Sequence, residues 1–113
     1  MRAMQFELIG IPSTSMAEPG GIARGIAVLR SAGLVERLRA AGHVYDAGDL
    51  TLRAGTGLRG RSGLLNEAAL GRLMVATHEA VAASHKRRRM PLLVGGDCPV
   101  LLGAPPAWGP ELG

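Results

Sequence analysis

The stretch of residues 20–50, GGIARGIAVLRSAGLVERLRAAGHVYDAGDL, sets the pattern for the whole chain. Between residues 22 and 41 the apolar side chains recur at the spacing of an amphipathic helix. These positions are Ile26, Leu29, Gly33, Leu34, Leu38 and Ala41. We expect an interruption near Gly33 and an end at Gly42, which stands where a C-cap is expected. Residues 43–46 (HVYD) then predict a short strand, and Ala47, Gly48 and Asp49 predict a turn.

Two other segments have the character of buried strands. Residues 4–11 (MQFELIGI) are mostly apolar and are followed by Pro12, which favours a strand over a helix of two turns. Residues 90–94 (MPLLV) form a continuous apolar run, as expected of a strand covered on both faces. Pro91 is compatible with such a strand only near its start or at a sheet edge.

A second helix is predicted to open at Asn66 and Glu67. Asn favours the N-cap, and a carboxylate in the first turn favours the positive end of the helix dipole. The expected buried stripe is Leu70, Leu73, Met74, Thr77, Val81 and Ser84. The helix ends in the basic run 85–89 (HKRRR), which is typical of a solvated helix C-terminus and alternatively contacts phosphate or an acidic partner.

The predicted order is therefore strand, helix, strand, helix, strand, which indicates a parallel sheet with right-handed crossovers. The fold class is α/β. Functional sites in such proteins lie in loops at the carboxyl ends of the strands. The glycine-rich loop 12–21 and the long connection 51–63 are candidates for loops over this edge, although the former matches no phosphate-binding motif.

Composition excludes several classes of function. The 113 residues fit at most one domain, and 13 basic against 9 acidic residues give a net charge of only +4. One Phe, one Tyr and one Trp leave the basic residues without the interleaved aromatics of many nucleic-acid surfaces, so we expect no nucleic-acid partner. No apolar stretch approaches the roughly 18–20 residues of a membrane span. The lone Cys98 forms no intrachain disulfide, and a cytoplasmic location is expected.

Two segments in this order resemble the arginase/agmatinase (ureohydrolase) family. Residues 20–50 resemble its glycine-rich turn, its helix with an ALR.AGL pattern and its strand ending in Asp-x-Gly-Asp. Residues 91–103 (PLLVGGDCPVLLG) resemble its apolar strand followed by Gly-Gly-Asp-His and a helix. The resemblance covers about residues 4–104, so residues 1–104 are expected to be the amino-terminal part of an arginase-like domain. Residues 105–113 form an irregular Pro/Gly-rich tail, and the chain looks truncated or shifted in reading frame there.

The resemblance implies a three-layer α/β/α fold of which only the first βαβαβ portion is present. It also implies a two-manganese site that hydrolyses small guanidino compounds such as arginine or agmatine. The family's first metal ligand, a His, falls on Cys98, and thiolate is a poorer partner for manganese than imidazole. The later Asp-x-His-x-Asp and Asp-x-Asp ligand motifs do not occur. Asp46, Asp49 and Asp97 carry turn and scaffold roles in the family pattern, so no catalytic or cofactor-binding residue is assigned.

Several alternatives stay open at this point. Cys98 is either an altered metal ligand or reactive thiol, or a small buried residue that replaced a lost ligand. The chain is either an arginase-type hydrolase that is inactive in this form, or a degenerate, non-catalytic paralogue that acts as a binding or assembly module. The second reading allows a homo-oligomer. A third hypothesis is a nucleotide- or nucleic-acid-binding unit that uses the basic run 85–89.

Overall fold

The computed structural model describes residues 4–13, 21–52 and 57–96. Its elements follow the predicted order of strand, helix, strand, helix, strand, with the first helix divided in two. They are β1 (Gln5–Gly10), α1 (Gly21–Ser31), α2 (Leu34–Ala41), β2 (His43–Asp49), α3 (Glu67–Lys86) and β3 (Met90–Val94). The helix expected after Pro99 and the expected domain boundary at residue 104 lie outside the described residues.

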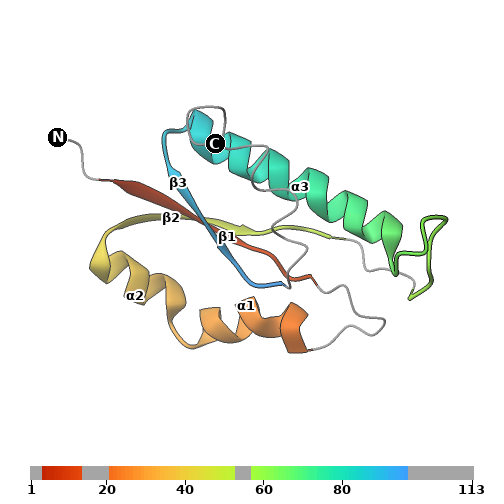
Figure 1. The fold of residues 1–113 in the computed structure, drawn as a ribbon. Coiled ribbons are helices and arrows are strands. Elements are labelled where there is room, and N and C mark those ends of the chain that lie inside the picture. The colour runs from red at the N-terminus through yellow and green to blue at the C-terminus, as the bar shows by residue number, and fades with distance from the viewer. Residues whose placement is uncertain (1–3, 14–20, 53–56, 97–113) are drawn as a thin grey trace.

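The three strands form one parallel sheet in the order β2-β1-β3. Helices α1 and α2 cover one face of this sheet and α3 covers the other (Figure 1). The described part of the chain is thus a three-layer α/β/α arrangement, which confirms the predicted fold class. Both crossovers place β1, the first strand, in the centre of the sheet, where it is hydrogen-bonded on both sides.

Alternation along β1 sends side chains into two apolar layers. Ile9 and Ile11 are buried on the α3 face, where they form a cluster with Leu73 of α3, and Leu93 of β3 packs against it. Leu8 is buried on the opposite face, the one that α1 covers with the buried Ile26. The alternating side chains of this one short strand therefore pack against the helices on both faces of the sheet.

The expected interruption at Gly33 is confirmed. Helix α1 ends at Ser31, and Gly33 adopts a left-handed φ of 94° that a residue with a Cβ rarely takes. Helix α2 then starts afresh, with the N–H of Arg37 donating to the carbonyl of Gly33 at 3.0 Å. Gly42 caps α2 as predicted, since its N–H donates to the carbonyl of Leu38.

Burial in α1 and α2 differs from the predicted apolar stripe. Leu29 was expected in the buried stripe, but it is 44% exposed. Val35, which the continuous helical pattern omits, is the buried residue of α2. Because α1 and α2 are separate helices with different axes, a single helical spacing of apolar residues does not describe both. In α3 the predicted Leu73, Thr77, Val81 and Ser84 are buried, whereas Met74 at the margin of the stripe is 39% exposed.

Strand β2 is longer than predicted. The segment of Ala47 to Asp49 was expected to be a turn, yet it continues the strand. Gly48 takes a positive φ of 81°, and the register with β1 shifts between Leu8 and Gly10. A glycine in this conformation produces a bulge rather than a chain reversal.

Strand β3 has the predicted bounds but not the predicted burial. Met90 is exposed and the other four residues are half-buried, so the described residues do not cover this strand on both faces. The N–H of Ile11 donates to the carbonyl of Val94 at 2.9 Å, which fixes Val94 and Leu92 as the residues whose backbone groups point toward β1. Pro91 therefore points its nitrogen away from β1 and removes no hydrogen bond from the sheet.

The connection before α3 differs from the predicted capping pattern. Asn66 precedes the helix in a left-handed conformation, with φ of 54°, and its side chain makes no cap hydrogen bond. Its Oδ1 accepts instead from the N–H of Gly57 at 2.7 Å. Asn66 is thus buried as the anchor of the preceding loop, while Glu67 stands in the first turn as expected.

Candidate functional site

The carboxyl ends of the three strands meet at one edge of the sheet because all three run parallel. Two backbone hydrogen bonds join them there. Leu50 N–H, after β2, donates to the carbonyl of Gly10 at 2.8 Å, and Ile11 N–H donates to the carbonyl of Val94. This carboxyl edge is where α/β proteins place their ligands, and it is the edge at which the sequence placed a site.

The turn after β3 is packed against the end of β1. Gly95 and Gly96 both have positive φ, 103° and 73°. A Cβ on Gly95 would lie 2.9 Å from the carbonyl oxygen of Ile11 and 3.3 Å from Cβ of Ile26. These two glycines bend the chain directly after β3 and bring it against the end of β1. Asp97 and Cys98, which follow it, lie outside the described residues, so the predicted metal ligand Cys98 stays a prediction.

Arg30 of α1 binds both aspartates of β2. Its Nη1 and Nη2 donate to the two carboxylate oxygens of Asp46 at 2.6 and 3.0 Å. Its Nε donates to Oδ1 of Asp49 at 3.0 Å. The Arg30 side chain is only 22% exposed. The guanidinium group ties α1 to the carboxyl half of β2.

Electrostatics follow this geometry. The hydrogen bonds from Arg30 lower the pKa of Asp46 below its ordinary value of 3.8, against a smaller opposing effect of burial. The Gly48 N–H, which donates to Oδ1 of Asp46 at 2.9 Å, lowers it further. Hydrogen bonding to Asp46 likewise raises the pKa of Arg30. Asp46 and Arg30 are therefore both charged at neutral pH.

Gly10 makes room for this group of charges. A Cβ built on Gly10 would overlap Oδ1 of Asp49 and would lie 2.8 Å from Cγ1 of Ile26. The carboxylate of Asp49 thus rests directly on the backbone of β1, opposite its register partner Gly10. The end of β1 needs glycine here because the aspartate occupies the side-chain space.

The described residues do not fit a two-manganese centre. Both oxygens of Asp46 and Oδ1 of Asp49 already accept hydrogen bonds from Arg30. Residues 4–13, 21–52 and 57–96 contain no group of three His, Cys, Asp or Glu side chains that could hold a metal ion. Asp46 and Asp49 instead hold the scaffold together, which is the role that the family pattern gave them.

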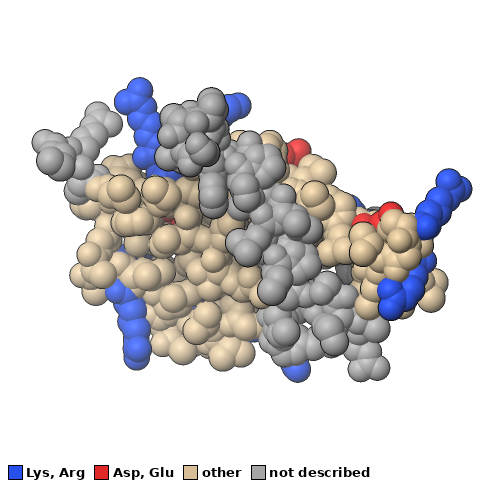
Figure 2. All heavy atoms as spheres, viewed as in Figure 1, with Lys and Arg blue, Asp and Glu red and all other residues tan. Residues whose placement is uncertain are grey.

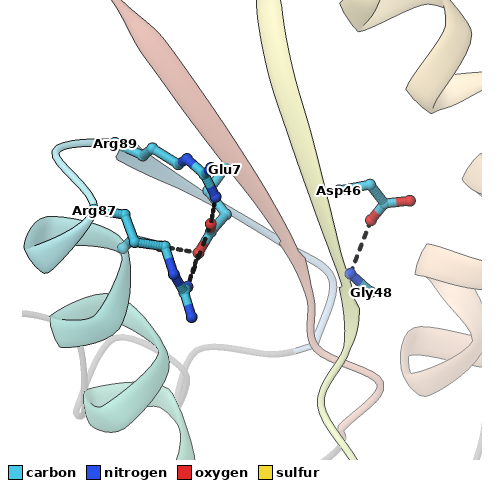
Figure 3. Close-up of polar contacts among 6 residues, drawn as sticks. Glu7, Asp46, Gly48, Arg87 and Arg89 are labelled. Carbon is cyan, nitrogen blue, oxygen red and sulfur yellow. Dashed lines mark hydrogen bonds and ion pairs between the residues drawn. The ribbon is translucent and has the colours of Figure 1, made fainter.

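A second polar cluster, formed by Glu7, Ser84, Arg87 and Arg89, was not predicted. Glu7 of β1 is 3% exposed and lies on the α3 face (Figure 3). Its carboxylate accepts hydrogen bonds from Ser84 Oγ at 2.5 Å and from Arg89 Nη1 at 2.6 Å. Arg87 Nη1 lies 3.1 Å from Glu7 Oε2. The Arg89 guanidinium also stacks 3.6 Å from the ring centroid of Tyr45 on β2.

This Glu7 cluster pins the end of α3 and the start of β3 to the central strand. Burial raises the pKa of Glu7, but the hydrogen bonds from Ser84 and Arg89 and the charges of Arg87 and Arg89 together bring it below its ordinary value of 4.5. A lone carboxylate inside an apolar strand was the available signal, because such a charge needs a buried partner. Two residues of the basic run, Arg87 and Arg89, are those partners, so the run is not simply a solvated helix end.

The charged surface bears on the third hypothesis. On the face seen in Figure 2 the Lys and Arg side chains lie around the periphery, several of them at the right-hand end beside acidic side chains, and the described surface between them is mostly uncharged. Nucleic-acid sites instead gather basic side chains on one face. In the part of the chain that the structure describes, no helix has the length and apolarity needed to cross a membrane.

Comparisons with known proteins agree with the fold. No family model matches the chain. It is 35% identical over 98 residues to arginase-1 of Oryctolagus cuniculus, covering 86% of this chain and 30% of that protein. It is 32% identical over 102 residues to an arginase of Staphylococcus aureus strain COL, covering 87% of this chain and 34% of that protein.

Solved structures give the same result. The arginase from Bacillus caldovelox superimposes with a TM-score of 0.77 at 28% identity, over 94% of this chain and 36% of that one. An arginase from Bacillus subtilis superimposes with a TM-score of 0.71 at 23% identity, over 90% of this chain and 33% of that one, and supports the fold alone. The chain spans about a third of the length of these relatives. Sequence and fold together show that this chain belongs to the arginase/agmatinase (ureohydrolase) family.

Proposed function

We propose that this chain supplies part of an arginase-type, metal-dependent hydrolase that acts on the C–N bonds of small guanidino compounds, and that it has no hydrolase activity alone. The observation that carries the proposal is the match of nearly the whole chain to about a third of an arginase structure. Arginine and agmatine are the substrates that the family resemblance implies. The described residues contribute the scaffold of such an enzyme.

The scaffold role rests on the contacts at the carboxyl edge. Arg30 holds the end of β2 through Asp46 and Asp49, and Gly10 lets Asp49 pack on β1. The Gly95 turn closes onto the carbonyl of Ile11 on the same face. These contacts fix the ends of all three strands, from which loops toward a substrate would extend.

The expected inactivity follows from the ligands. Metal-assisted attack of water on a guanidinium carbon uses two divalent ions held by several carboxylate and imidazole groups. The 113 residues contain neither the Asp-x-His-x-Asp nor the Asp-x-Asp motif, and the family resemblance puts Cys98 at the position of the first ligand. No step of such a reaction is assigned to the described residues, because they do not fit the metal pair.

Urea release tests this proposal. The purified 113-residue chain, incubated with Mn²⁺ and either arginine or agmatine, is expected to release no urea above a heat-denatured sample. A Gly95→Val variant, whose branched side chain cannot fit against Ile11, serves as a control for trace contamination because any contaminant would retain its activity. Urea release by the natural chain that the variant loses would contradict the proposal.

The second candidate function is a non-catalytic assembly module. It is favoured by the large apolar side chains that the described residues leave at the surface, among them Val28, Leu58, Leu64 and Val75, each more than half exposed. Exposed apolar side chains mark association where they gather in one contiguous patch. Sedimentation equilibrium over a range of concentrations distinguishes the two candidates, since a strictly monomeric mass would remove the case for a self-assembling module.

A further inference from the structure

We propose that the corner at which α3 turns into β3 is a docking surface for an acidic segment of a partner protein. This α3–β3 corner consists of Lys86, Arg87, Arg88 and Arg89, and the partly exposed ring of Tyr45 lies beside it. It lies at the amino end of β3, whereas the candidate site lies at the carboxyl edge of the sheet. The docking surface is therefore separate from the proposed hydrolytic function.

Arg88 stands where a helix commonly ends in glycine. Its N–H donates to the carbonyl of His85, and the N–H of Arg89 donates to the carbonyl of Ser84, both at 2.9 Å. These are the two bonds of a Schellman motif, whose left-handed residue is usually glycine because a Cβ disfavours that conformation. Arg88 adopts it with a φ of 57°. Turn geometry therefore favours glycine here and does not account for the arginine.

The α3–β3 corner also carries more positive charge than the described residues balance. Arg87 and Arg89 share the single carboxylate of Glu7 (Figure 3). Lys86 and Arg88 are exposed, and neither forms an ion pair with a described aspartate or glutamate. An excess of one charge at one place on the surface attracts a partner of opposite charge and speeds its association.

Two of the arginines are held in place before any partner binds. The guanidinium group of Arg89 donates to Glu7 and stacks on the ring of Tyr45. Arg87 contacts the same carboxylate, yet its side chain is 54% exposed. A guanidinium group that is already fixed loses less conformational freedom on binding, and its planar fork can bind two carboxylate oxygens at once. Arg87 therefore offers a preformed contact for an acidic side chain.

The surroundings favour a protein segment over a nucleic acid. Tyr45 is 41% exposed, so an apolar side chain of the partner can pack against its ring while carboxylates reach the arginines. The positive charge is gathered in four consecutive residues. A nucleic-acid backbone is instead bound by basic side chains spread along a face. A short acidic segment therefore matches both the size and the chemistry of this surface.

Fluorescence anisotropy with a labelled polyglutamate peptide tests the proposal on the 113-residue chain, without metal or substrate. We expect saturable binding that weakens about fivefold or more between about 20 and about 200 mM NaCl, because salt screens exposed charges. A polyglutamine peptide of equal length is the matched probe and should not bind. Tighter binding of a single-stranded DNA of equal length would overturn the assignment to an acidic protein segment.

Arg88→Gly separates a binding role from a structural one. Glycine removes the charge and suits the left-handed turn, so the variant should bind the peptide about fivefold more weakly and unfold at a temperature about 2–5 °C higher. Arg61→Gly is the matched control, since it removes the same charge from an exposed position in the loop before α3. Its affinity should fall less than about twofold. Equal weakening by the two variants would overturn the docking surface, because net charge alone would then explain the binding.

Failure of the docking surface is distinct from failure of the proposed function. Absence of peptide binding at low salt, or a lower unfolding temperature for Arg88→Gly, would overturn the docking surface and leave the expected lack of hydrolase activity unchanged. Urea release by the chain alone would overturn the proposed function and leave the peptide binding as it stands.

Discussion

Glu7 and Arg89 are 82 residues apart in the sequence, and their side chains meet at 2.6 Å between a buried carboxylate and a guanidinium group. Arg89 lies just before β3, and Glu7 lies in the central strand. Ser84 at the end of α3 donates to the same carboxylate. The carboxylate of Glu7 therefore connects the central strand β1 to α3 and to the segment that leads from α3 into β3.

Glu7→Gln is expected to lower the free energy of unfolding by about 1–3 kcal/mol. The amide keeps the shape of the side chain but loses the negative charge that binds Arg87 and Arg89. Its NH₂ group also replaces an oxygen that accepts hydrogen bonds, so donor would face donor. Urea denaturation followed by circular dichroism measures the change. Glu79→Gln on the exposed face of α3 is the matched control, with an expected change within about 0.5 kcal/mol. Equal effects of the two substitutions would contradict the role of Glu7.

Stability is expected to fall in acid. The pKa of Glu7 and the pKa of Asp46 are both lower in the folded chain than their ordinary values of 4.5 and 3.8. A lowered folded pKa contributes stability that is present above the unfolded pKa and is lost as the pH falls through the folded pKa. The free energy of unfolding should therefore be level near neutral pH and decline below about pH 4.5.

Glu7→Gln provides the control for this pH dependence, because it removes one of the two titrating groups. The variant should lose less stability than the natural chain between pH 5 and pH 3, by chemical denaturation at each pH. Parallel curves for the two proteins would show that Glu7 is not responsible.

Gly10→Ala is expected to destabilise the chain by about 2–3 kcal/mol, because the added methyl group would overlap the Asp49 carboxylate and crowd Ile26. Gly25→Ala is the matched control within α1, since a Cβ there meets nothing within 4 Å. That substitution should stabilise the helix by about 0.5–1 kcal/mol. Thermal unfolding of both variants should shift in opposite directions, and a shift in the same direction would contradict the packing described.

Arg30→Lys is expected to cost about 0.5–1.5 kcal/mol, since an ammonium group cannot bind Asp46 with two nitrogens and also reach Asp49. The value is modest because the Asp49 side chain is 34% exposed and solvent screens the pair. Arg37→Lys on the exposed surface of α2 is the control and should change the free energy of unfolding by less than about 0.5 kcal/mol. An Arg30→Lys variant as stable as this control would show that the two-pronged contact contributes nothing.

The sequence predicted the elements well where local signals agreed. The apolar run at residues 90–94, the carboxylate at Glu67 and the glycines at Gly33 and Gly42 each fixed a boundary that the structure confirms. Hydrophobic period and capping chemistry are local properties, so they can be read without knowing the partner of a segment.

The sequence failed where a long-range partner decides the outcome. Gly48 looked like a turn residue, but pairing with β1 made it a bulge inside β2. Asn66 was predicted to be the N-cap of α3, but its side-chain oxygen accepts a hydrogen bond from the N–H of Gly57 instead. Leu29 looked buried, but it is 44% exposed although Ile26, three residues earlier in the same helix, is buried.

The candidate site was predictable only in outline. The sequence predicted a site at the carboxyl ends of parallel strands, and the structure brings those ends together at one edge of the sheet. Arg30 gave no local signal of its contacts. The carboxylate of Glu7 in an apolar strand signalled that a buried partner was needed but not which residue it was, because the partners meet only when the layers assemble. The metal role of Cys98 remains a prediction from the family resemblance.

Manganese binding by the chain tests most directly the central claim that these residues hold an arginase scaffold without its metal centre. In a titration of the folded 113-residue chain with Mn²⁺, the electron paramagnetic resonance signal of the free ion should match that of buffer alone at every addition. Loss of that signal until two ions are taken up per chain, with a spin-coupled spectrum appearing in its place, would contradict the account.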